Sequence, residues 1–137
     1  MKVRDVMHRG AECLDDDTPI SDVARRMRDA DVGAIPISAA GELVGIITDR
    51  DIACRAVADG ADLDQLTARD VMSKDAVCCA YDDDLSDAVR IMESRRIRRL
   101  PVMADGALVG MLSLGDVASR AGAPLSAEVL RAVSSHH

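Results

Sequence analysis

Two short motifs combine a hydroxyl with a carboxylate three residues later. Thr48 is followed by Asp51, and Ser113 by Asp116, each pair directly after a glycine and two apolar residues. Where a strand turns into a helix, such a hydroxyl lies beside free backbone N–H groups, which attract anions. A carboxylate can accept hydrogen bonds from the vicinal hydroxyls of a ribose. The two motifs therefore predict sites for a sugar phosphate.

The same spacing also fits a helix cap. A Thr or Ser at the N-cap with an Asp at the third helical position forms a capping box, and the helix dipole favours the carboxylate there. For a single motif the cap is the simpler interpretation. Two copies in one register favour a ligand site, and both interpretations stay open at this point.

The elements that position these motifs come from an internal repeat. Asp5-Val6-Met7 recurs 65 residues later as Asp70-Val71-Met72, and the offset holds without a gap as far as Asp116. Such a register predicts two copies of one structural unit. We expect repeats at residues 1–60 and 61–122, followed by a helix or tail at 123–137.

Each copy reads as a β-α-β-β-α element. We expect short strands around 11–14 and 76–79, and a helix in which Thr18 is the N-cap and Pro19 the first residue. Strands at 35–37 and 43–47 flank a turn at Gly41, and a second helix ends at Gly60. The second copy repeats this order. The predicted fold is α/β (α+β), with the two copies packed sheet to sheet around a pseudo-two-fold axis that creates two clefts.

The repeat, the Asp-Val-Met starts, the Ile/Leu-Pro strands and the Thr/Ser-x-x-Asp endings together resemble a tandem pair of cystathionine-β-synthase (CBS) domains. The resemblance covers residues 3–120. A pair of this size is similar to small bacterial CBS-pair proteins. It implies binding of AMP, ADP or ATP, or else NAD(H) or S-adenosylmethionine, between the repeats. By position, it assigns phosphate and ribose contacts to Thr48, Asp51, Ser113 and Asp116.

The resemblance implies further contacts. In nucleotide-binding members, basic residues before the Leu-Pro strand hold phosphate, and Arg98 and Arg99 occupy those positions. Gly33 and Ala34 replace them in the first copy, where Arg50 is the nearest substitute. A solvated basic patch is the alternative for these arginines.

For adenine, the resemblance implies backbone contacts and an apolar wall, although an ordinary core strand explains each of these residues at least as well. The expected residues are Ala11, Glu12, Ala76 and Val77 for the backbone contacts, and Ile37 and Val102 for the wall. Pro36 and Pro101 belong to the same expected site.

Composition limits the function classes. The formal net charge is −7, and there is no Phe or Trp and one Tyr, which disfavours nucleic acid. No apolar run approaches the ~20 residues of a membrane span, and the start shows no signal peptide, so we expect a cytoplasmic protein.

The four cysteines include no CxxC pair, which argues against a zinc site, and we expect reduced thiols, with a redox role left open for Cys13 and Cys78. The acidic runs at 15–17 and 82–84 read as turns and caps rather than metal sites. No nucleophile and base occur in a recognisable catalytic motif, so we expect no enzyme. The predicted function is a homodimeric, nucleotide-binding regulatory module. A ligand-free dimerisation or protein-interaction module is the alternative.

Overall fold

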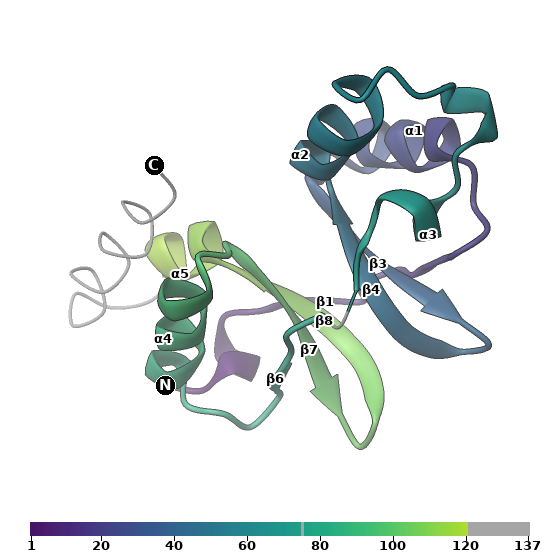
Figure 1. Ribbon diagram of the computed structural model, residues 1–137. Coiled ribbons are helices and arrows are strands. Elements are labelled where there is room, and N and C mark those ends of the chain that lie inside the picture. Colours follow the sequence, from purple (N-terminus) through teal and green to yellow (C-terminus); the bar gives the residue numbers. More distant parts are fainter. Residues whose placement is uncertain (75, 121–137) are drawn as a thin grey trace. The chain divides into compact units, whose positions relative to one another are not determined.

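The computed structural model describes residues 1–74 and 76–120 and has the mixed α+β fold that the sequence predicts. The chain forms two compact units, each with its own sheet and its own helices (Figure 1). We call residues 12–76 the first-copy unit. Residues 1–11 together with residues 77–120 are the second-copy unit.

The first-copy unit contains a four-stranded sheet in the order β2-β3-β4-β5. Strand β2 runs parallel to β3, and the other neighbours are antiparallel. Apolar side chains of the sheet and of the helices form one core, which includes Ile20, Val23, Ile37 and Ile47. The elements are β2 (Leu14–Asp15), α1 (Ile20–Ala30), β3 (Ala34–Ala39), β4 (Glu42–Thr48), α2 (Asp49–Asp51), the π-helical η2 (Ile52–Val57), η3 (Leu63–Gln65), α3 (Ala68–Val71) and β5 (Ser73–Lys74).

The second-copy unit repeats this plan with the sheet order β1-β8-β7-β6. Its core includes Leu85, Val89, Leu100 and Leu112, none of which is exposed to solvent. The elements are η1 (Val3–Asp5), β1 (His8–Arg9), β6 (Cys79–Ala80), α4 (Leu85–Arg95), β7 (Arg99–Ala104), β8 (Ala107–Ser113) and α5 (Leu114–Arg120).

The compact units do not follow the repeat along the chain, because each Asp-Val-Met segment completes the core of the other copy. Val6 and Met7 are buried in the second-copy core, and β1 pairs with β8. Val71 and Met72 are buried in the first-copy core, and β5 pairs with β4. The repeat identifies the two segments, whereas only the three-dimensional structure assigns each to a sheet.

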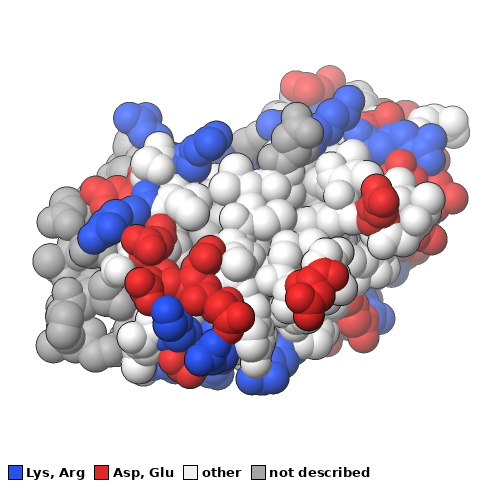
Figure 2. All heavy atoms as spheres, turned by 90° about the horizontal axis from the view of Figure 1, so that it is seen from below, with Lys and Arg blue, Asp and Glu red and all other residues white. Residues whose placement is uncertain are grey.

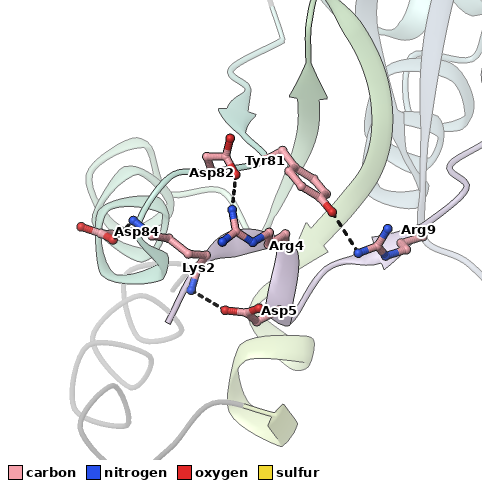
Figure 3. A network of polar contacts seen from close by, with 7 residues as sticks. All are labelled: Lys2, Arg4, Asp5, Arg9, Tyr81, Asp82 and Asp84. Atoms are coloured by element: carbon pink, nitrogen blue, oxygen red, sulfur yellow. Dashed lines mark hydrogen bonds and ion pairs between the residues drawn. The ribbon is translucent and has the colours of Figure 1, made fainter.

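Polar contacts hold the N-terminal segment on the turn before α4 (Figure 3). Lys2 Nζ lies 2.7 Å from Asp84 Oδ1, and Arg4 forms an ion pair with Asp82. The Arg9 Nη2 group donates a 3.0 Å hydrogen bond to the Tyr81 hydroxyl. The acidic run at 82–84 therefore has a docking role in addition to the turn that the sequence predicts.

Two of the predicted boundaries differ from the structure. Helix α1 begins at Ile20, and Pro19, the expected first residue, is the N-cap with extended backbone. Pro19 forms a bridge with Thr67, and the Ile20 N–H donates to the Leu66 carbonyl, so the docked segment fixes this backbone. The expected strands at 11–14 and 76–79 are shorter and begin later, at Leu14 and Cys79.

The second helix ends earlier than the sequence predicts. The helix that starts at Asp49 ends with η2 at Val57, and Gly60 follows in a turn with a φ of +69°. The expected hairpin turns are confirmed. Ala40 and Gly41 both have positive φ, as do Asp105 and Gly106 in the second copy, which is the backbone of a type I′ turn.

Candidate functional site

The first junction, residues 48–51, joins β4 to α2. The Thr48 hydroxyl accepts a 3.1 Å hydrogen bond from the Asp51 N–H, and Asp51 Oδ2 accepts a 2.9 Å bond from the Thr48 N–H. These reciprocal bonds form the capping box that was the alternative interpretation of this motif. The box leaves Asp51 Oδ1, which lies 4.0 Å from Arg55 Nε, and the hydroxyl proton of Thr48.

The second junction, residues 113–116, joins β8 to α5 and differs from the first. The Ser113 hydroxyl accepts a 3.0 Å hydrogen bond from the Asp116 N–H. Within the described residues, no return bond runs from the Ser113 N–H to Asp116. Instead Asp116 Oδ1 lies 3.5 Å from His8 Nε2, and 14% of the Asp116 side chain is exposed. Among the described residues, neither oxygen of Asp116 therefore accepts a capping bond, whereas one oxygen of Asp51 does.

Arg98 and Arg99 lie beside the second junction. Arg99 pairs with Ser113 across β7 and β8, and the Arg98 carbonyl accepts a 3.0 Å bond from the Leu114 N–H. Neither guanidinium forms an ion pair with a residue in the described part of the chain. In the first copy, Ala34 pairs with Thr48 in the same way and brings no charge. Positive charge is thus concentrated at the second junction.

Each junction has one arginine that the sequence analysis did not single out. Arg55 Nη1 donates to the Val71 and Met72 carbonyls at 3.3 and 3.2 Å. Arg120, at the matching position of the second copy, donates through Nη1 to the Val6 carbonyl at 3.3 Å. Each arginine therefore joins a junction helix to the docked Asp-Val-Met segment. The signal was present in the sequence, because the repeat offset extends four residues beyond Asp51 and Asp116.

Close packing explains the glycine in each motif. A Cβ at Gly110 would lie 2.2 Å from the His8 carbonyl oxygen, and one at Gly45 would lie 2.6 Å from the Ser73 carbonyl oxygen. Strands β1 and β5 can therefore pair beside the junctions only because these two positions lack a side chain.

The residues expected to contact adenine have different environments. Ile37 and Val102 have no exposed surface and belong to the two cores, so their side chains are not open to a ligand in this structure. Pro36 in β3 and Pro101 in β7 are also buried. Ala11, Ala76 and Val77 are half-buried. Glu12 is exposed and forms an ion pair with Arg26.

The remaining predicted features are less informative. The Arg50 side chain is exposed, and its backbone N–H donates a hydrogen bond to Asp49 Oδ1. Burial raises the pKa of the Cys13 and Cys78 thiols, which makes both less reactive. Within residues 1–74 and 76–120, no group of His, Cys, Asp or Glu side chains could hold a metal ion, and no helix is long and apolar enough to span a membrane. The predicted tail at 123–137 lies outside the described residues.

The surface shows no extended basic region on the face drawn in Figure 2. Acidic side chains gather in groups there, with Lys and Arg side chains beside them. A nucleic-acid-binding surface would instead present a continuous stripe of positive charge. This face is therefore in keeping with the formal net charge of −7.

Comparisons with known proteins agree with this geometry. A family model for the CBS domain matches twice, at residues 3–56 and 68–122. The CBS domain-containing protein YhcV of Bacillus subtilis is 39% identical over 116 residues, which cover 85% of this chain and 82% of that protein.

Two solved structures share the fold. A CBS-domain protein of unknown function from Thermoplasma acidophilum has a TM-score of 0.90 at 22% identity, covering 99% of this chain and 76% of that chain. The CBS-domain pair of protein MJ0100, solved with 5-methylthioadenosine and S-adenosylmethionine, has a TM-score of 0.79 at 24% identity, covering 87% and 94%.

Proposed function

The chain belongs to the CBS-domain family, and on that premise we propose that it is a regulatory module that binds an adenosine nucleotide at the second junction. One observation carries the proposal. Two arginines without a carboxylate partner among the described residues flank a hydroxyl and a carboxylate at the start of α5. No catalytic role is part of the proposal.

Each group at the second junction has a chemical role in the bound state. Arg98 and Arg99 hold phosphate oxygens, because a guanidinium can give two parallel hydrogen bonds to one phosphate. The Ser113 hydroxyl donates a further bond to phosphate. Asp116 accepts bonds from the ribose hydroxyls, since among the described residues no capping bond takes either of its oxygens.

The two arginines at the second junction favour a ligand with several negative charges. Two arginines match the several charges of ADP or ATP better than the single phosphate of AMP or the cationic sulfur of S-adenosylmethionine. The MJ0100 domain pair supports the adenosine part of the proposal, since its structure contains two adenosine compounds. We therefore rank ATP and ADP above AMP and S-adenosylmethionine, and NAD(H), whose diphosphate has two charges, stays an alternative.

The first junction is proposed as a weaker site. Its carboxylate is bonded within the capping box, and Gly33 and Ala34 bring no charge to the strand beside it. Arg50 is the cation closest in sequence. Such a site suits the nucleoside part of a ligand or a monophosphate, so we expect occupancy there only at higher concentration.

We propose that the module is a homodimer. The physical support is exposed apolar surface on the first-copy unit, where Val57 is 60% exposed and Leu63 is 39% exposed. Sedimentation velocity with wild type and Val57→Asp tests this. A dimer of wild type that weakens in the variant supports the proposal, and a monomeric wild type contradicts it.

Thermal unfolding with a panel of nucleotides tests the ligand. At about 100 times its dissociation constant, a ligand adds about 2.7 kcal/mol of stability, which raises the melting temperature by several degrees. We expect ATP and ADP to give the largest shifts. Asp116→Ala should abolish them, and the matched variant Asp51→Ala should retain them. A flat panel would contradict nucleotide binding and would favour a ligand-free interaction module.

A further inference from the structure

Helix α5 connects the second junction to the N-terminal segment, which comprises residues 1–11. The helix begins at the junction and carries Asp116 in its first turn. At its other end, Arg120 Nη1 donates a 3.3 Å hydrogen bond to the Val6 carbonyl. Val117, between these two points, is 1% exposed and belongs to the core that also contains Val6. A change in the position of α5 therefore acts on the packing of the N-terminal segment.

Strand β8 provides a second connection between the junction and the segment. It ends at Ser113, and earlier along the strand Gly110 pairs with Arg9 of β1. The Gly10 N–H donates a 3.2 Å hydrogen bond to the Val109 carbonyl. Both elements that form the second junction, β8 and α5, therefore contact the N-terminal segment. A ligand that fixes the junction also fixes two of the elements on which this segment docks.

The N-terminal segment can separate from its unit and leave the rest of the sheet intact. Strand β1 has two residues and lies at the edge of the order β1-β8-β7-β6, so its release breaks a single pairing. Lys2 and Arg4 hold the segment on the turn before α4 through ion pairs whose four side chains are at least 42% exposed (Figure 3). Exposed ion pairs add little stability. Burial of Val3 and Val6 keeps the docked state dominant, but such an edge opens more readily than the central strands.

The first-copy unit provides a matched segment for comparison. Residues 66–74 dock on that unit through β5 and through the bonds from Arg55 to the Val71 and Met72 carbonyls. One oxygen of Asp51, the carboxylate at that junction, is held within the capping box. Because the proposed nucleotide site is at the other junction, we expect the docking of residues 66–74 not to respond to nucleotide.

We propose that docking of the N-terminal segment is coupled to nucleotide binding at the second junction. This inference rests on the proposed function. Contacts of phosphate with Ser113 and of ribose with Asp116 fix the start of α5 and its connection to β8. The fixed helix holds Arg120 against the Val6 carbonyl and keeps Val117 in the shared core, which stabilises the docked segment. Coupling of this kind is reciprocal, so release of the segment weakens nucleotide binding by the same factor.

Hydrogen exchange of the full chain with and without saturating ATP, followed by mass spectrometry, tests the coupling. The amides of Val3, Arg4 and Gly10 report the docking, because each donates to a carbonyl outside the segment. We expect these amides to exchange at least about fivefold more slowly with ATP, which is the lower end of typical coupling between sites. The matched amides of Ala68 and Arg69, which donate to the turn before α1, should be unaffected.

The amides of the central strand β7 separate release of the segment from unfolding of the whole unit. Without ATP, the segment should exchange faster than β7. Equal rates would mean that the segment opens only when the unit unfolds, and this result would overturn the inference.

Two arginine variants test the connection through α5. Arg120→Ala should reduce the effect of ATP on exchange of the segment, whereas Arg55→Ala, the matched change in the first copy, should leave that effect unchanged. An equal effect of ATP in both variants would contradict the role of α5. Calorimetric titration of ATP into the same samples separates this inference from the proposed function. ATP binding without slower exchange of the segment overturns the coupling alone, and absent ATP binding overturns the proposed function together with the coupling.

Discussion

Replacing Gly110 by alanine inserts a methyl group against the backbone of the docked N-terminal segment. The new Cβ would lie 2.2 Å from the His8 carbonyl oxygen and 3.3 Å from Met7 Sδ. The sulfur belongs to a flexible side chain and can move. The carbonyl cannot rotate away, because β1 is paired with β8 through Arg9 and Gly110 itself. The strand must therefore separate from its neighbour or shift along it.

The size of the effect follows from this contact. Overpacking of this kind costs about 1–3 kcal/mol, and we expect the upper end because backbone must move. Complete release of the segment would cost more, since Val3, Val6 and Met7 are at most 5% exposed and each contributes about 1.5–3 kcal/mol when buried. For a chain of this length, 3 kcal/mol lowers the melting temperature by about 10 °C.

Urea and thermal unfolding of Gly110→Ala measure this loss, and Gly115→Ala is the matched control. A Cβ at Gly115 would be 3.6 Å from Ser113 Oγ, and the position is exposed on α5. Alanine there should leave the free energy of unfolding unchanged or raise it by up to about 1 kcal/mol. If Gly110→Ala were as stable as wild type, the close approach of β1 to β8 would be refuted.

Three further predictions concern other residues. Burial, together with the negative charges of nearby groups, raises the pKa of Cys79 to about 12. Alkylation at pH 8 followed by peptide mass spectrometry should therefore find Cys79 modified long after the exposed Cys54. Comparable rates of modification would contradict this. The pKa of Asp70 is lowered, chiefly by the hydrogen bond that it accepts from the Thr67 N–H, so its contribution is present above about pH 4 and is lost as the pH falls through the folded-state value. Asp70→Asn should therefore lower stability at pH 7, by no more than about 1 kcal/mol for this exposed group, and have no effect at pH 2; an equal effect at both pH values would argue against this cause. Arg55→Lys should lower the free energy of unfolding in urea by about 1 kcal/mol, because an ammonium cannot contact two carbonyls and a carboxylate in this geometry. An unchanged urea midpoint would show that these contacts contribute nothing.

The elements could be predicted from the sequence where local signals decide them. Leu85, Ala88, Val89 and Met92 have the i, i+3, i+4, i+7 spacing of one helical face, and all four side chains are buried in the second-copy core. Local signals failed at Pro19, where the docked segment around Thr67 holds the backbone extended. The sequences of the two Asp-Val-Met segments are nearly identical, so they do not indicate the sheet on which each segment packs. That choice depends on chain connectivity between the units.

The candidate site was predictable in its residue types but not in its geometry. The spacing of Ser113 and Asp116 gave the junction correctly, and it equally gave the capping box that forms at Thr48 and Asp51. The capping bond from the Thr48 N–H takes one oxygen of Asp51, whereas among the described residues no capping bond takes an oxygen of Asp116. The contact of His8 with Asp116 arises from β1 pairing, which no motif near either residue indicates.

Calorimetric titration of ATP and of adenosine into wild type and an Arg98→Ala, Arg99→Ala double variant tests the central claim most directly. If the arginines beside Ser113 hold phosphate, the double variant should bind ATP at least about tenfold more weakly and bind adenosine as wild type does. Equal affinities of wild type and the double variant for ATP would contradict phosphate binding at the second junction.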